Sequence, residues 1–294
     1  MSNTINPTNK ISFIAHRGIS LYKIPENTPE AIEQAFKAGF AVETDIQKIQ
    51  GGFVLYHDDF IPGPNDTTLN GGGFYLPSGK KQTIECTLKD LLLLAQFDRV
   101  NHEAILFKQT GERIKLDYKE EPRIATLGDL IYLLKKYPDA KVHLEIKRPI
   151  ETAIYNDGIE EELVGILKDD GVLEQITIIS FNESSLINTR KVNSNIKLGT
   201  DIYGKQATNP QEAKRMRDEI GISYWNPPLK QINLATINAF HEISKLGLEI
   251  APWPWGETKR QELDGIQDLI QTFQLRTIMT NQAEIVDEII NQKK

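Results

Sequence analysis

Three acidic residues stand inside runs that otherwise look like buried strands. Glu43 and Asp45 lie one residue apart in AVETDI, and Glu145 lies in KVHLEI. Because side chains alternate along a strand, Glu43 and Asp45 point to one side, as do His143, Glu145 and Lys147. A buried carboxylate is costly unless it is paired or bound to a cation. The pattern predicts either a site for a hard cation, Mg²⁺ or Ca²⁺, or an ion pair of Lys147 with Glu43 or Glu145.

Two histidines directly follow extended apolar runs. His16 follows ISFIA, and His57 comes after FVLY. Since the pKa of imidazole lies close to neutral pH, two histidines beside a carboxylate-bound cation can divide acid and base work. A lone histidine is more often structural, and we assign His102, His143 and His241 to an insertion, the lower core and an outer helix.

The elements that must position these residues alternate along the chain. Short β-branched runs predict strands at 11–15, 41–46, 141–146, 176–180, 196–200, 221–225, 248–252 and 276–280. Helical spacing and caps predict helices at 28–38, 127–136, 152–168, 183–192, 210–218, 234–246, 257–273 and 282–291. Eight strand-then-helix units predict an α/β fold, a (β/α)8 TIM barrel, with an open doubly wound sheet as the alternative.

A barrel would bring the chemical residues together. Glu43, Asp45 and Glu145 would converge in its interior, near the carboxyl ends of two neighbouring strands. His16 and His57 would stand at the mouth, where the active sites of this fold lie.

The segment after the second strand breaks the alternation. A turn-rich stretch replaces a connection that is normally short, and only 88–95 has helical character. We predict a single domain over 1–294, with 59–125 as an insertion over the mouth. A long loop without a role is the alternative.

Composition excludes several classes of protein. The chain has 294 residues and a net charge of −7, without the Lys/Arg-rich block that binds nucleic acid. No apolar run approaches the roughly 20 residues of a membrane span, and MSNTINPTNK lacks the apolar core of a secretory signal. We therefore expect a cytoplasmic protein. The lone Cys86 is predicted to be a buried small residue, since it has no disulfide partner.

Five short motifs then carry a resemblance. AHRG, PENT, ETD, HD and LEIK occur in the order and approximate spacing of the glycerophosphodiester phosphodiesterase family, and ISF and IMTNQAE are similar to its last motifs. The resemblance covers nearly the whole chain. It implies a phospholipase C-like phosphodiesterase barrel that hydrolyses glycerophosphodiesters to glycerol 3-phosphate and an alcohol, with one divalent cation.

The resemblance also implies roles for eight residues: metal ligands Glu43, Asp45 and Glu145, an acid/base pair His16 and His57, phosphate contacts Arg17 and Lys147, and a supporting Glu26. Two segments depart from the family pattern. IQKIQGG replaces the usual threonine and Asp-Gly turn after ETD, and PWPWGET resembles the seventh-strand WTVN only loosely. The second departure alters one wall of the mouth.

Two other functions remain alternatives. A lysophospholipase D or another phospholipid phosphodiesterase could use the same barrel, and the apolar GGGFYLP of the insertion favours it modestly. A noncatalytic ligand-binding barrel is disfavoured, because such proteins normally lose a catalytic histidine or a metal ligand and this chain keeps them all. The expected partner is a small-molecule substrate; the alcohol, the native metal, the acid and base assignment and the oligomeric state stay open.

Overall fold

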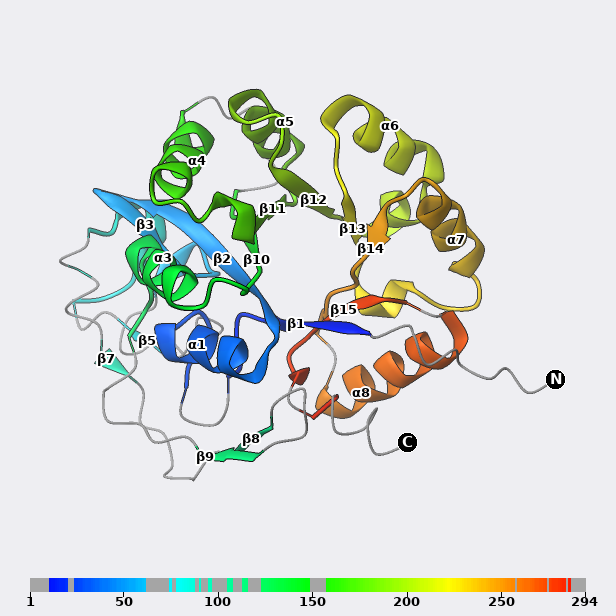
Figure 1. The fold of residues 1–294 in the computed structure, drawn as a ribbon, viewed down its shortest axis with the longest axis horizontal. Helices are drawn as coiled ribbons and strands as arrows, with labels where there is room; N and C mark the ends of the chain where they lie inside the picture. The colour runs from blue at the N-terminus through cyan, green and yellow to red at the C-terminus, as the bar shows by residue number, and fades with distance from the viewer. Residues whose placement is uncertain are drawn as a thin grey trace.

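Eight parallel strands form the centre of the protein (Figure 1). The structure is a computed structural model that describes residues 11–20, 24–61, 74–75, 78–87, 90, 95–96, 105–107, 113–115, 123–148, 157–256, 258–273, 275–283 and 285–286. The strands are β1 (Ser12–His16), β2 (Ala41–Ile49), β10 (Val142–Ile146), β11 (Ile176–Ser180), β12 (Lys197–Asp201), β13 (Tyr224–Asn226), β14 (Glu249–Ile250) and β15 (Thr277–Thr280). They lie side by side in the order β14-β13-β12-β11-β10-β2-β1-β15.

The two ends of this strand order meet. The backbone N–H of Met279 on β15 donates to the carbonyl of Pro252, just after β14, at 2.9 Å. The hydroxyl of Thr277 donates to the carboxylate of Glu249. These contacts nearly close the sheet, so the predicted (β/α)8 barrel is confirmed and the open sheet is not formed.

Helices surround the strands on the outside (Figure 1). They are α1 (Pro29–Ala38), α3 (Leu127–Lys136), α4 (Ile159–Asp169), α5 (Glu183–Val192), α6 (Pro210–Ile220), α7 (Ile237–Lys245) and α8 (Lys259–Asp268), which a π-helical turn (Leu269–Phe273) extends. Short 3-10 turns occur at Thr83–Glu85, Leu173–Gln175, Gly204–Thr208 and Leu229–Gln231. Within the described part of the chain, no helix combines the length and apolar character of a membrane span.

Most helix predictions are accurate to a few residues. In α1, Thr28 accepts a hydrogen bond from the Ala31 backbone N–H, and Gly39 ends the helix at φ 84°. The prediction at 152–168 is wrong at its start: α4 begins at Ile159 after Gly158, and 152–156 lie outside the described residues. The prediction at 282–291 is helical at 283 and 285–286, and its remainder lies outside the described residues.

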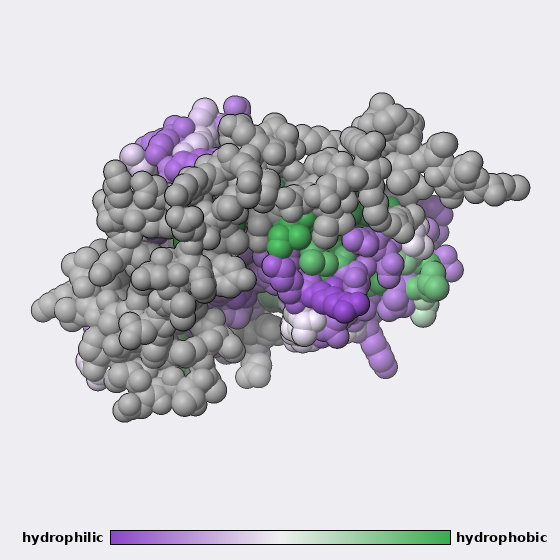
Figure 2. All heavy atoms as spheres, turned by 90° about the horizontal axis from the view of Figure 1, so that it is seen from below, coloured by the Kyte–Doolittle hydropathy of each residue, from purple (hydrophilic) through white to green (hydrophobic). Residues whose placement is uncertain are grey.

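The apolar core lies between the strands and the helices. Alternate strand residues such as Val42, Leu144, Ile178 and Trp225 face outward into it and are fully buried. A smaller apolar cluster, formed by Ile14, Ile179, Ala251 and Met279, is separate from this core. Figure 2 shows the face that carries α8, where the described residues are mainly hydrophilic with smaller hydrophobic areas. The described part of this face is therefore mainly polar, as expected for the outward side of amphipathic helices.

The segment after β2 is only partly described. β3 (Gly52–Val54) returns antiparallel to β2, and three further short pairs follow: β4 (Phe60–Ile61) with β6 (Lys81–Gln82), β5 (Phe74–Tyr75) with β7 (Ala95–Gln96), and β8 (Ile105–Phe107) with β9 (Arg113–Lys115). Cys86 packs in a small cluster with Ile49, Val54, Tyr56, Ile61 and Ile124, so its predicted burial is confirmed. Most of the predicted helix at 88–95 lies outside the described residues, and Ala95 belongs to a strand. The position of 59–125 over the mouth stays a prediction.

The remaining histidines have mixed outcomes. His143 is buried in the barrel and His241 is exposed on α7, as predicted. His102 lies outside the described residues.

Gly18 is expected to be indispensable for the turn between β1 and α1. Its φ is +82°, and a Cβ would come within 2.6 Å of the Ala31 backbone carbon. Gly18→Ala should therefore destabilise the protein by at least about 2 kcal/mol in urea unfolding. The matched change Gly165→Ala in α4, where a Cβ meets nothing within 4 Å, should stabilise it by about 0.5–1 kcal/mol. Equal effects of the two changes would contradict this account of the turn.

Candidate active site

A pocket of about 600 Å³ lies at the carboxyl ends of the strands. Seven of the eight site residues predicted from the sequence line it: His16, Arg17, Glu26, Glu43, His57, Glu145 and Lys147. The eighth, Asp45, is buried directly behind them, in contact with Arg17 and Lys147. Residues far apart in the chain are thus gathered at the end of the barrel where active sites occur.

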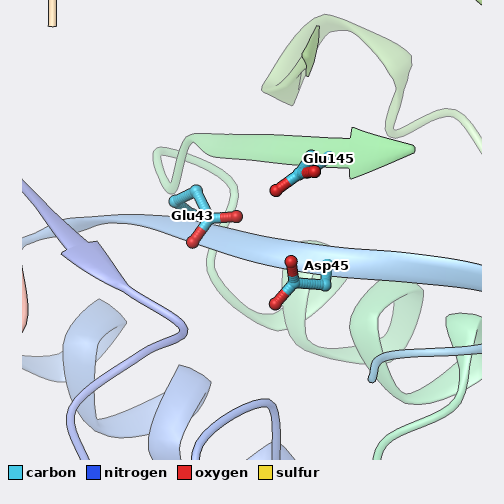
Figure 3. A group of neighbouring side chains, drawn as sticks. All are labelled: Glu43, Asp45 and Glu145. Atoms are coloured by element: carbon cyan, nitrogen blue, oxygen red, sulfur yellow. The ribbon is translucent and has the colours of Figure 1, made fainter. Parts of the chain in front are cut away.

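The three predicted metal ligands come from two adjacent strands. In the register of β2 and β10, Glu43 lies opposite His143, and Asp45 lies opposite Glu145. The carboxylates of Glu43, Asp45 and Glu145 point toward one another (Figure 3), and one oxygen from each lies within 4.8 Å of the others. All three side chains are buried.

Two of these carboxylates keep oxygens without a hydrogen bond. Oε1 of Glu43 and Oδ1 of Asp45 are buried and have no hydrogen-bond partner among the described residues. Burial, together with the charges of Asp45 and Glu145, raises the pKa of Glu43 well above its usual value. Burial also raises the pKa of Glu145 to about 7. Buried oxygens without a hydrogen bond on converging carboxylates fit a divalent cation such as Mg²⁺ or Ca²⁺.

Arg17 and Lys147 compensate part of this negative charge. Nε of Arg17 lies 3.2 Å from Oδ2 of Asp45, and Nζ of Lys147 lies 3.0 Å from Oε1 of Glu145 and 3.5 Å from Oδ1 of Asp45. Burial alone would raise the pKa of Asp45, but the two cations hold it below its usual value. The ion pair of Lys147 with Glu145 therefore exists, and among the described residues no lysine or arginine side chain forms such a pair with Glu43.

A chain of hydrogen bonds orients His16. Its Nδ1 lies 2.6 Å from Oδ1 of Asn281, while the side-chain amide nitrogen of Asn281 donates to Oε2 of the buried Glu262 at 3.3 Å. Because Glu262 is an acceptor, the Asn281 oxygen must face the histidine, and Nδ1 of His16 carries the proton. Nε2 then presents its lone pair, 3.6 Å from Oε2 of Glu43. Burial and Arg17 lower the pKa of His16 to about 3, so its ring is neutral.

His57 has a different partner. Its Nδ1 lies 2.7 Å from Oδ1 of Asp58, and its side chain is 33% exposed, against 14% for His16. The side-chain amide of Gln47 donates to the carbonyls of Tyr56 and Asp58, both at 2.8 Å. Gln47 therefore fixes the backbone that carries His57.

The PENT turn supports the site through two residues. Oε1 of Glu26 accepts a hydrogen bond from Nη1 of Arg17 at 2.7 Å. The side chain of Asn27 donates to Oδ2 of Asp45 at 2.9 Å and accepts from the hydroxyl of Thr44 at 2.7 Å. Asn27 also adopts a left-handed backbone conformation, φ 55°, which an asparagine tolerates better than most residues.

Four residues that support the predicted groups were not predicted from the sequence: Asn27, Gln47, Glu262 and Asn281. Of these, Asn281 lines the pocket. The sequence signals were the PENT motif for Asn27 and the IMTNQAE motif for Asn281. Asp201 at the end of β12 also lines the pocket; it is buried and accepts a hydrogen bond from the Asn226 side chain at 2.9 Å. The signal for Asp201 was its place at the end of a predicted strand.

The architecture is that of a barrel enzyme, with its charged pocket at the carboxyl ends of the strands. The model of the glycerophosphoryl diester phosphodiesterase family matches residues 16–272. The chain belongs to this family.

Individual relatives agree with the assignment of the chain to this family. The glycerophosphodiester phosphodiesterase of Caldanaerobacter subterraneus subsp. tengcongensis is 33% identical over 192 residues, which cover 65% of this chain and 66% of that protein, just under two thirds of its length. A candidate glycerophosphodiester phosphodiesterase from Galdieria sulphuraria superposes with a TM-score of 0.71 at 15% identity, covering 96% of this chain and 98% of the other. An Oleispira antarctica phosphodiesterase, solved with its product sn-glycerol-3-phosphate, superposes with a TM-score of 0.67 at 19% identity, covering 95% and 96%. The two structural likenesses show the shared fold.

The metal-free protein is expected to lose stability as the pH rises from 6.5 to 8. Burial raises the pKa values of Glu145 and Asp201 to about 7 from 4.5 and 3.8, so the folded state keeps protons that the unfolded state has released. The pKa values of His16 and His143 are lowered from 6.5, and these rings are mostly neutral in both states above that pH. The melting temperature in chelator should therefore fall across this window, and Mg²⁺ or Ca²⁺ should flatten the decline. A melting temperature in chelator that stays constant or rises over this pH range would contradict the raised pKa values of Glu145 and Asp201.

Proposed function

We propose that this protein hydrolyses glycerophosphodiesters to glycerol 3-phosphate and an alcohol, with the help of one divalent cation. The observation that carries the proposal is the meeting of three buried carboxylates, two of which keep oxygens without a hydrogen bond, with two imidazoles at one pocket. The two imidazoles have different hydrogen-bond partners. Family membership and the product bound by the Oleispira antarctica phosphodiesterase support the substrate class.

Glu43, Asp45 and Glu145 would hold the cation. Their oxygen donors suit Mg²⁺ and Ca²⁺ alike. When bound, the ion would polarise a nonbridging phosphate oxygen and offset the charge that develops at phosphorus. Arg17 and Lys147 line the same pocket, and in our proposal they bind the phosphate and stabilise that charge from the protein side.

The hydrogen bonds of the two histidines support different roles. His16 donates through Nδ1 to the neutral oxygen of Asn281, so its free Nε2 is the proposed base that takes a proton from the nucleophile. His57 has the carboxylate of Asp58 against Nδ1, where His16 has a neutral amide oxygen. Its Nε2 is the proposed acid that protonates the departing alkoxide. The nucleophile is either water or the adjacent glycerol hydroxyl, which would form a cyclic phosphate before water opens it.

A phospholipid phosphodiesterase activity is the second candidate. A groove beside the pocket shares Trp255 and Gly256 with it. Its lining combines apolar residues (Leu229, Ile232, Leu234, Leu269 and Phe273) with polar ones (Lys230, Asn233, Gln261, Asp268 and Thr272). Such a groove would accept an acyl chain, so lysophospholipids belong in the substrate panel.

A noncatalytic barrel is disfavoured, because both histidines and all three carboxylates are kept. The cytoplasmic location expected from the sequence stays a prediction.

The function is tested by assaying glycerol 3-phosphate released from a panel of glycerophosphodiesters and lysophospholipids. We expect release with Mg²⁺ or Ca²⁺, loss in excess chelator and recovery when the ion is restored. Glu145→Gln should reduce turnover by more than the roughly 10–100-fold typical of residues behind a metal ligand. The matched change Glu161→Gln, on the exposed face of α4, should leave it unchanged. Full activity in chelator, or in Glu145→Gln, would refute the metal assignment.

The acid and base roles are tested by changing the leaving group. A p-nitrophenyl ester needs no proton on its leaving group, so His57→Ala should retain activity on it within about tenfold. The same variant should lose about 10²–10⁴-fold on an alkyl ester. His16→Ala should lose activity on both substrates, because the base is still required. If steady-state assays show instead that His16→Ala retains activity on the p-nitrophenyl ester and His57→Ala loses activity on both esters, His57 is the base and His16 is the acid.

A further inference from the structure

Glu262 is a buried carboxylate behind one wall of the reaction pocket. It lies in the first turn of α8, is 1% exposed and contacts Asn281, which lines the pocket. The hydroxyl of Thr280 donates to its Oε1 at 2.5 Å, and the backbone N–H of Asn281 donates to the same oxygen at 2.7 Å. The side-chain amide of Asn281 donates to Oε2 at 3.3 Å. An apolar residue would fill this space without the cost of burying a charge, so Glu262 contributes something other than packing.

The helix that carries Glu262 is fixed at its start and along its inner face. The hydroxyl of Thr258 accepts from the backbone N–H of Gln261 at 3.3 Å, and the side chain of Gln261 accepts from the backbone N–H of Thr258 at 3.0 Å. Ile266 and Leu269, one and two turns after Glu262, share its face and are buried. Figure 1 shows α8 outside the barrel, next to β15 and β1. Glu262 therefore projects from a fixed helix onto the residues at the end of β15.

The side chain of Asn281 links Glu262 to His16. Its Oδ1 lies 2.6 Å from Nδ1 of His16, and its Nδ2 donates to Glu262. An amide has two orientations of nearly equal shape, and each matches one tautomer of a neutral imidazole. With the amide oxygen toward His16 the ring proton is on Nδ1, and with the amide nitrogen toward His16 it is on Nε2. Only the first orientation lets the amide donate to Glu262, because the second would bring two acceptor oxygens together.

The tautomer decides what His16 can do in the pocket. Its Nε2 is the nitrogen on the side of the carboxylates, 3.6 Å from Oε2 of Glu43. A proton on Nδ1 leaves a lone pair on Nε2, which can accept a proton from a nucleophile. A proton on Nε2 removes that lone pair, so the ring cannot serve as a base toward the pocket.

We propose that Glu262 is a positioning residue that sets the tautomer of His16, so that a carboxylate on the outer helix α8 determines whether the base can accept a proton. The inference rests on the proposed function, which gives His16 the role of base. Glu262 acts through Asn281 and not by contact with the substrate.

Glu262→Gln is expected to reverse the amide of Asn281. The new carbonyl oxygen would stay with the two donors that now reach Oε1, the Thr280 hydroxyl and the Asn281 backbone N–H. The new NH₂ group would then face the NH₂ group of Asn281, and two donors would meet. Half a turn of the Asn281 amide removes this conflict. Its nitrogen then donates to Nδ1 of His16, and the ring proton moves to Nε2.

NMR reads the tautomer directly. Long-range ¹H–¹⁵N correlation spectra of the histidine rings would be recorded at pH 8 in the metal-free protein without substrate, and the spectrum of His16→Ala would identify the His16 signals. We expect the Nδ1–H tautomer in the wild type and the Nε2–H tautomer in Glu262→Gln. The Nε2–H tautomer in the wild type, or the Nδ1–H tautomer in folded Glu262→Gln, would overturn the proposal.

Steady-state kinetics give the catalytic consequence. Glu262→Gln should lower kcat by at least about tenfold, toward the roughly 10²–10⁴-fold that a general base contributes, with KM little changed. The loss should be similar on the alkyl and p-nitrophenyl esters, because both need the base. Asp264→Asn removes a carboxylate that is 69% exposed on the same helix. It is the matched control and should change neither the tautomer nor kcat. A wild-type kcat in Glu262→Gln would contradict the proposal.

An exchange of the two side-chain groups separates positioning from packing. In the double variant Glu262→Gln/Asn281→Asp, the new carboxylate can accept from Nδ1–H of His16 and from the new NH₂ group, so each donor again faces an acceptor. The Nδ1–H tautomer and most of kcat should return. If the second change recovers neither in folded protein, Glu262 acts through packing and the proposal is wrong.

The tautomer measurement also separates this proposal from the proposed function, because it needs no turnover. A protein whose His16 tautomer follows Glu262 as expected, but which releases no glycerol 3-phosphate from any diester, would refute only the proposed function. A protein that hydrolyses diesters, and whose His16 tautomer is the same in the wild type and in Glu262→Gln, would refute only the present inference.

Discussion

The mutual repulsion of three buried carboxylates is the constraint on which the rest of the pocket depends. Glu43, Asp45 and Glu145 approach within 4.8 Å in a region where water screens charge poorly. Arg17 and Lys147 balance Asp45 and Glu145, yet buried oxygens of Glu43 and Asp45 remain without hydrogen-bond partners among the described residues. A barrel stabilised by its apolar core can tolerate this arrangement, and a bound cation would turn the repulsion into binding energy.

The pairing of the first and last strands completes the same region. β1 pairs in parallel with β15, with Ala15 opposite Thr280, so that Asn281 contacts His16 and fixes which nitrogen carries the proton. Most of the polar groups then lie on or just after four neighbouring strands, β15, β1, β2 and β10, and His57 follows β3. Asp201 ends β12, and the aromatic residues Phe181, Trp253 and Trp255 follow β11 and β14. This division gives the pocket two chemically different halves.

Local patterns predicted the features that depend on neighbouring residues. Strand alternation correctly put Glu43 and Asp45 on one side, and the caps of α1 were readable because Thr28 and Gly39 adjoin the helix. The contacts that were missed join distant residues. Asn281 meets His16 across 265 positions, and Asn226 meets Asp201 through the register of β12 and β13. Such contacts depend on strand register and closure, which local patterns do not specify. The start of α4 was misplaced because its N-cap is Gly158 rather than a residue with a capping side chain.

The central claim is that these three carboxylates bind one divalent cation in the reaction pocket. The most direct measurement is a crystal structure of the protein loaded with Mn²⁺, which resembles Mg²⁺ in its preference for oxygen ligands, with anomalous diffraction data collected at the manganese edge. The account predicts one strong anomalous peak at about 2.0–2.3 Å from oxygens of Glu43, Asp45 and Glu145. An empty triad, with manganese bound elsewhere or nowhere, would contradict it.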